Sequence, residues 1–204
     1  MPCIQAALSG LSIQMGDIDV FAAVSGPGSF TGLRIGIATI KAFAYACGKP
    51  AVGIPTLDSL ARNLAGRPGA LICPIMDAKN ANIYQAIYKS QPIYVRENIE
   101  TCTRLADTML IDIGSAAGRL GSALENDPDI GYIIFNGDAT LAYIDFFRTE
   151  LKGVPCFAAA EPELCQNASS AALLACEAAD AGRLVSPDAL APDYFNAGYM
   201  AKKT

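Results

Sequence analysis

A glycine-rich turn that leads straight into an apolar helix is the feature that most limits how this chain can fold. The turn, Gly26–Gly32, reads Gly-Pro-Gly-Ser-Phe-Thr-Gly. The apolar segment Asp19–Val24 before it predicts a buried strand, and the segment after it predicts a helix to about Cys47, stopped by Gly48-Lys-Pro. A strand, a glycine loop and a helix in this order aim backbone N–H groups and a helix N-terminus at one point, which favours anion binding.

Two interpretations of the turn stay open. As a phosphate loop, it would use backbone and hydroxyl groups of Gly26, Gly28, Ser29, Thr31 and Gly32. However, it lacks the lysine of a Walker motif, and it lacks the full Gly-x-Gly-x-x-Gly spacing with an acidic residue about 20 positions later. As a structural device, it would be a tight turn whose hydroxyls cap the helix. We expect any phosphate contact to be weak or vestigial.

The helix after the turn is apolar on nearly all sides. From Leu33 to Cys47 its charged residues are Arg34 and Lys41. Such a helix must be covered on more than one side. The cover is either its own sheet and a neighbouring helix of the same chain, or a second subunit. On the second interpretation we expect a protein interface formed by Leu33, Gly36, Ile37, Ile40 and Phe43.

Composition narrows the chemistry that the chain can perform. The 204 residues are 52% hydrophobic, carry a net charge of −5 and include no histidine. The histidine count excludes Ser-His and Cys-His nucleophile pairs and histidine metal clusters. An acidic chain without a basic run is not expected to grip nucleic acid alone. Seven scattered cysteines without a Cys-x-x-Cys pair are typical of reduced cytoplasmic thiols, and no signal peptide or membrane helix is expected.

The rest of the chain predicts alternating strands and helices, hence an α/β fold with a mixed sheet. We expect a domain boundary near Gly66–Gly69, giving a first domain over 1–68 and a second over 69–204, with the last helix and tail packing back on the first. An antiparallel meander is predicted where three strands follow one another. The expected strands are 51–54, 70–76, 81–88, 93–95, 132–135 and 154–158, and the expected helices are 2–11, 56–65 capped by Thr56, 101–126 with a break at Gly114, 139–151 and 169–181.

Two short polar motifs follow predicted strands. Asp77-Ala-Lys79 could bind a metal or a substrate hydroxyl, or it could only shape the turn. Asn136-Gly-Asp138 could contact a ligand, or it could form a turn and an N-cap. The residues alone leave both choices open.

Taken together, these motifs resemble the TsaB (YeaZ) family over nearly the whole chain. The Gly26–Gly36 run is the specific part of the resemblance, and the other motifs fit in order. They are the helix Ala38-Thr-Ile-Lys-Ala42, Gly48-Lys-Pro50, the strand-end segment Asp77–Tyr84, Asn136-Gly-Asp138 and Pro192-Asp-Tyr194.

The resemblance implies a fold and a function. The fold is the actin/hexokinase/Hsp70-like ATPase fold with two α/β domains. The implied function is that of a non-catalytic partner subunit in threonylcarbamoyl transfer to adenosine 37 of tRNAs that read codons beginning with A. The partner that the resemblance implies is a TsaD-like transferase, joined by a TsaE-like ATPase, with a homodimer in the partner's absence and tRNA bound only through the complex. It implies no cofactor of the chain's own, only ATP or ADP shared at the partner interface.

The chain departs from the family pattern at its start. The family normally begins with a strand that carries an Asp-Thr-Ser phosphate loop and a hairpin, and the sequence does not show them before the helix at 2–11. We therefore expect a first domain that lacks its N-terminal strands and leaves an open sheet edge. The rival hypotheses are a small-molecule kinase or ATPase of the same fold, which needs that loop, and a metalloprotease, which the histidine count disfavours.

Overall fold

The structure is a computed structural model that describes residues 2–91 and 102–195. The chain divides into two compact units. The first comprises residues 1–25, 29–54 and 171–192, and the second comprises 26–28, 55–170 and 193–204. The segment 171–192, which holds most of the last helix, groups with the first unit. The helix after residue 55, which the expected boundary assigns to the first domain, groups with the second.

The first unit is built on two adjacent strands, β1 (Phe21–Gly26) and β2 (Ala51–Pro55), joined through α2 (Phe30–Cys47). The Phe21 N–H donates to the Pro50 carbonyl at 3.1 Å, so the two strands start side by side and run in the same direction. The unit also holds α1 (Pro2–Leu11), most of α6 (Ala168–Asp180) and the 3-10 turns η1 (Met15–Asp17) and η2 (Pro187–Ala189).

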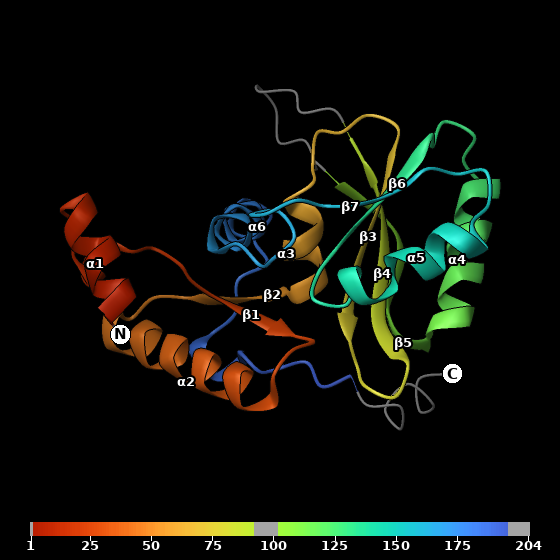
Figure 1. Cartoon of the computed structure of the whole chain (residues 1–204). Coiled ribbons are helices and arrows are strands. Elements are labelled where there is room, and N and C mark those ends of the chain that lie inside the picture. The colour runs from red at the N-terminus through yellow and green to blue at the C-terminus, as the bar shows by residue number, and fades with distance from the viewer. Residues whose placement is uncertain (1, 92–101, 196–204) are drawn as a thin grey trace. The chain divides into compact units, whose positions relative to one another are not determined.

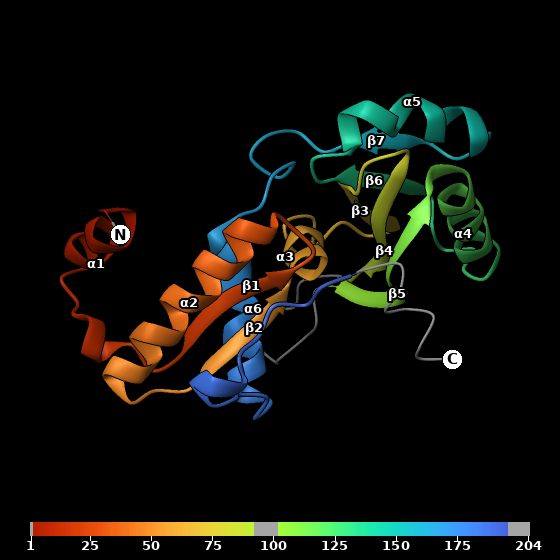
Figure 2. The ribbon, with the colours of Figure 1, turned by 90° about the horizontal axis from the view of Figure 1, so that it is seen from below.

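Alternation along these strands produces two apolar faces in the first unit. Phe21 and Ala51 pack with the inward side of α2, whereas Val52 and Ile54 pack with Ala175 and Ala178 of α6. Successive side chains of a strand point to opposite faces, so one sheet buries both helices. Figures 1 and 2 show α2 and α6 on opposite sides of β1 and β2. By contrast, no residue of α1 is buried.

The described strands of the second unit form a mixed sheet in the order β5-β4-β3-β6-β7. The pairs β3–β4 and β4–β5 are antiparallel, and β3–β6 and β6–β7 are parallel. One face packs against α4 and α5 through Leu120 and Phe147, and the other packs against α3 through Leu57 and Leu60 (Figure 1). The bounds are α3 (Thr56–Arg62), β3 (Ala70–Asp77), β4 (Asn82–Ser90), β5 (Cys102–Asp112), α4 (Ile113–Glu125), β6 (Tyr132–Asn136), α5 (Thr140–Glu150) and β7 (Cys156–Ala158).

The α/β class and the antiparallel meander are confirmed, but the third strand of the meander is not where the sequence predicts it. The expected strand at 93–95 lies outside the described residues. The expected helix at 101–126 is wrong in its first half, because Cys102–Asp112 forms β5 and pairs with β4. The helix starts at Ile113, where the Asp112 carboxylate accepts the Ser115 N–H at 2.9 Å.

The cap expected at Thr56 is also wrong. Helix α3 begins at Thr56 itself, with Pro55 in the N-cap position and without a side-chain cap bond. Thr56 is buried, and its hydroxyl oxygen has no hydrogen-bond partner in the described part of the chain. Burial of the first turn against the second unit's sheet, rather than side-chain capping, therefore fixes the start of α3.

Candidate protein interface

The glycine turn ends β1 and starts α2. Gly26 is buried with a φ of +133°, a conformation that residues with a Cβ rarely adopt, whereas Gly28 is exposed. Ser29 is the N-cap of α2, because its hydroxyl accepts the Gly32 N–H at 3.3 Å. Thr31 lies exposed in the first turn of the helix. The turn therefore makes a sharp chain reversal and caps a helix, as its structural interpretation requires.

The cap uses one of the donors that a phosphate loop would offer. The Gly32 N–H is engaged by Ser29, and an added Cβ at Gly32 would lie 3.4 Å from the Ser29 Cβ. Ser29 would have to release this bond before Gly32 could donate to an anion. Phosphate contact at the five residues predicted for it stays a prediction, with this competing bond to overcome.

Helix α2 has a covered side. Ile37 and Ala44 are buried, Ile40 and Phe43 pack on the same cluster, and Phe21 of β1 meets Phe43 with ring centroids 6.3 Å apart. Three residues expected at an interface with another subunit, Ile37, Ile40 and Phe43, therefore lie on the side of α2 that packs against its own sheet. The intrachain interpretation of the apolar helix holds for this side.

The opposite side of α2 is open and nearly uncharged. Leu33 is half-buried and Gly36 is exposed, so Gly36 is the member of the expected interface set that faces solvent. Ile35 is 63% exposed and Tyr45 is 54% exposed, although both are large and apolar in part. The exposed side consists of Thr31, Gly32, Arg34, Ile35, Gly36, Ala38, Ala42, Tyr45 and Ala46, with the half-buried Thr39 among them, and we call it the α2 outer face.

The two charged groups of α2 are held by neighbours. The Arg34 guanidinium carbon lies 4.0 Å from the centroid of the Phe30 ring. The Lys41 ammonium donates to the carbonyls of Asp188 and Leu190, at 3.0 and 3.2 Å. A face of apolar and small residues with its cations occupied in this way is typical of a protein contact surface.

The segment η2 borders the C-terminal part of the α2 outer face. The Tyr45 hydroxyl donates to the Asp188 carboxylate, and this bond to a carboxylate raises the pKa of Tyr45. Together with the Lys41 bonds, it fixes the 3-10 turn against α2. Sequence reasoning missed Asp188 and Tyr45, since the two are 143 positions apart and neither belongs to a motif.

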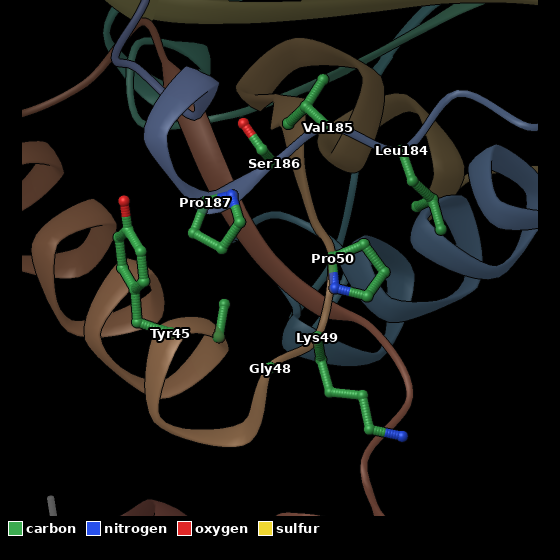
Figure 3. Close-up of a pocket in the computed structure, with 9 residues that line it drawn as sticks. Tyr45, Gly48, Lys49, Pro50, Leu184, Val185, Ser186 and Pro187 are labelled. Atoms are coloured by element: carbon green, nitrogen blue, oxygen red, sulfur yellow. The ribbon is translucent and has the colours of Figure 1, made fainter.

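A shallow cavity of about 350 Å³ lies next to these residues in the first unit. Figure 3 shows Tyr45 rising from α2 toward the turn that holds Pro187, whereas Lys49 extends away from it. The Lys49 ammonium pairs with the Asp19 carboxylate at 2.9 Å. The cavity is lined by Ala44, Tyr45, Gly48, Lys49, Pro50, Leu184, Val185, Ser186 and Pro187. Its mostly apolar wall extends the α2 outer face.

The two polar motifs of the second unit come together and shape their own turns. β3 and β6 run parallel, so their last residues, Asp77 and Asn136, lie at the same end of the sheet. The Asp138 carboxylate accepts the Asp77 N–H at 2.9 Å, and the Asp77 carboxylate accepts the Lys79 N–H and pairs with the Lys79 ammonium, at 2.8 and 2.6 Å. The two hydrogen bonds from Lys79, first that of its ammonium and then that of its backbone N–H, lower the pKa of Asp77. In the described residues, acidic and cysteine side chains form no cluster that could hold a metal ion.

Comparison with known proteins identifies the family. The family model described as "TsaD: tRNA N6-adenosine threonylcarbamoyltransferase" matches residues 1–179. The chain belongs to the TsaD family. Two bacterial relatives carry the name tRNA threonylcarbamoyladenosine biosynthesis protein TsaB, which confirms the resemblance to TsaB within this family.

The TsaB relatives match the chain in part. The Bacillus subtilis protein is 26% identical over 161 residues, which span 67% of this chain and 70% of that protein. The Escherichia coli protein is 33% identical over 90 residues, which span 44% of this chain and 39% of that protein.

A solved structure confirms the fold class. A crystal structure of an uncharacterized protein from Pseudomonas aeruginosa, described as similar to peptidase YEAZ, has a TM-score of 0.74 and 20% identity, covering 96% of this chain and 82% of that one. At this identity the likeness establishes the fold, and with the family match it supports the actin-like ATPase fold expected for this member of the TsaD family. No helix in the described residues is both long and apolar enough to cross a membrane.

Proposed function

We propose that this chain is a non-catalytic partner subunit in tRNA threonylcarbamoyladenosine biosynthesis, and that it activates a TsaD-like transferase by forming a heterodimer through the α2 outer face. Relatives named for this pathway support the assignment, and the TsaD family match suggests the kind of partner. The observation that carries the interface is the open, nearly uncharged side of α2, with Ile35 and Tyr45 exposed.

The chemistry that the chain offers supports the accessory role. It contains no histidine, so it cannot supply a histidine metal site or a histidine general base. Its net charge of −5 favours a complex in which the partner holds most of the tRNA. A TsaE-like ATPase joins this complex, and a homodimer through the same α2 face forms in the absence of the partner. The site of action is the cytoplasm, where tRNA is modified.

Any nucleotide belongs to the complex rather than to the chain alone. We expect ATP or ADP to bind only where the partner adds donors, since the Gly32 N–H is engaged by Ser29. ATP should then raise the melting temperature of the complex but leave that of the isolated chain unchanged. A saturable shift with the isolated chain would instead favour the rival function, a nucleotide-dependent kinase or ATPase.

The test of the proposed function is a reconstitution with the TsaD-like protein of the same organism. The two proteins are co-purified, and tRNA modification is assayed with and without this chain. Ala42→Arg places a large cation on the α2 outer face and should abolish both co-purification and stimulation. Ala172→Arg changes an exposed alanine of α6 in the same way and should leave both intact. Stimulation that survives Ala42→Arg would contradict the proposed interface, and full activity without this chain would contradict the function.

A further inference from the structure

A cavity of about 440 Å³ lies in the second unit where α4 covers β4 and β5. Its volume is within the range of sites that bind small molecules. Ile87, Leu105, Ala106 and Ala123 supply apolar wall, and the polar lining comes from Arg119, Ser122, Asn126 and Asp127. None of the motifs in the sequence and none of the family's implied roles involves these residues.

Arg119 is a half-buried cation whose hydrogen-bond acceptors in the described residues are neutral. Its Nη1 donates to the Gln85 side-chain oxygen at 3.1 Å, and its Nη2 donates to the Asp107 carbonyl at 2.9 Å. Within the described part of the chain, no carboxylate forms an ion pair with Arg119, and its Nε–H makes no hydrogen bond. Its Nη1 also donates to the Gln85 carbonyl at 3.5 Å, so three of the five N–H donors of the guanidinium are engaged and two remain for a ligand. Burial lowers the pKa of Arg119, and the nearby Cys73 and Asp107 oppose this shift only in part.

Groups of β4 and β5 hold the Arg119 side chain in place. Gln85 is fully buried, and its amide donates to the Ala116 carbonyl at 3.2 Å, which turns its oxygen toward Arg119. The β4–β5 pairing shifts register twice, on either side of the Ile87–Ala106 pair. Each register shift adds one residue to β5. Asp107 lies in one of these bulges, and its carbonyl accepts a hydrogen bond from Arg119. Bulges of this kind often occur next to functional sites, because they redirect groups away from the ladder.

The far end of the cavity is close to neutral. The Asp127 carboxylate pairs with the Lys89 ammonium at 2.5 Å, so it does not present an unbalanced negative charge to a ligand. A ligand therefore meets a cation that forms no ion pair in the described residues, an apolar wall, and a polar end where Asp127 and Lys89 balance each other. A multiply charged phosphate would find too few cations, whereas a single carboxylate matches the planar donors of one guanidinium.

We propose that this cavity binds a small monocarboxylate with a short branched apolar chain. The carboxylate lies on Arg119, and the apolar chain packs against Ile87, Leu105 and Ala106. The site is confined to the second unit and does not depend on the proposed α2 interface.

The test is an NMR titration of the full chain, labelled with ¹⁵N, with three probes. Isovalerate carries the charge and the branched chain, isovaleramide carries the chain alone, and inorganic phosphate carries charge alone. We expect isovalerate to give saturable shifts of amide signals from α4 and β5. We expect isovaleramide and phosphate to bind at least tenfold more weakly.

Two variants and a control locate the site. Arg119→Gln should weaken isovalerate binding at least tenfold, and Ser122→Leu should block the cavity from an exposed position on α4. Gly118→Leu adds the same side chain to α4 at a position whose Cβ would have no described atom within 4 Å apart from its chain neighbours and its own helix backbone, and this variant should bind like the parent. If Arg119→Gln fails to fold, the comparison of Ser122→Leu with Gly118→Leu still tests whether isovalerate binds in the cavity. Equal binding of the amide or of phosphate, or unchanged binding in Ser122→Leu, would overturn the proposal.

Discussion

The Tyr88 hydroxyl donates to the Asp58 carboxylate at 2.5 Å and thereby ties α3 to β4 in the second unit. Arg104 of β5 forms an ion pair with the same carboxylate oxygen, and its guanidinium lies 5.7 Å from the Tyr88 ring centroid. Burial first, and then the charge of Asp58, raises the pKa of Tyr88. One carboxylate thus joins a helix to two strands.

We predict that Asp58→Asn lowers the free energy of unfolding by about 1–2 kcal/mol, because both hydrogen bonds lose the charge that strengthens them. Urea denaturation measures the loss. Asp145→Asn is the matched control, since Asp145 is 89% exposed where it pairs with Arg148 and should contribute little. An equal effect of the two substitutions would show that the Asp58 network is no stronger than a surface ion pair.

Ionised Asp127 should stabilise the folded protein, and this contribution should be lost at low pH. The Lys89 ammonium, 2.5 Å away, lowers the pKa of Asp127 in the folded state. A carboxyl group with a lowered folded pKa stabilises the protein above its unfolded pKa of about 3.9, and the contribution disappears as the pH falls through the folded value. We therefore predict that Asp127→Asn flattens the decline in melting temperature below about pH 4. A decline as steep as that of the parent would mean that other carboxylates cause the loss of stability at low pH.

Two glycines with similar backbone angles separate steric crowding from backbone strain. Gly137 has a φ of +96°, and an added Cβ would lie 2.2 Å from the Ile75 carbonyl oxygen. Gly153 has a φ of +93°, but no described atom lies within 4 Å of its Cβ position. We predict that Gly153→Ala costs about 1 kcal/mol in free energy of unfolding and that Gly137→Ala costs several times more. Similar costs, measured by urea denaturation, would mean that β3 and β6 can separate at this edge.

The sequence predicted the elements whose signals are local. The helix end at Gly48 was predictable because a left-handed residue after an apolar run is a strong stop signal, and its φ is +61°. β5 was not predictable, since Leu105 and Met109 have helical spacing and the two bulges break the alternation that would mark a strand. Pairing with β4, a tertiary contact, decides its conformation.

The candidate interface was predictable only in part for a similar reason. The all-round apolar composition of α2 predicts cover on more than one side, but it does not tell which residues face which cover. Burial of Ile37 depends on the sheet, and attachment of Lys41 depends on η2, whose residues follow almost 150 positions later. Residues from distant segments determine which side of α2 stays open.

Gly36→Leu tests that open side without disturbing the unit that carries it. Gly36 is exposed, and apart from its chain neighbours and the backbone of its own helix no described atom lies within 4 Å of its Cβ position, so the isolated chain has room for a leucine. Leucine should even strengthen α2 by about 0.5–1 kcal/mol, because glycine is a poor helix former. A close helix contact with a second subunit would be blocked, so we predict a lower mass in light scattering together with an unchanged or higher melting temperature. Gly118→Leu on α4 is the control and should keep the parent mass, whereas an unchanged mass in Gly36→Leu would exclude this side of α2 from the homodimer.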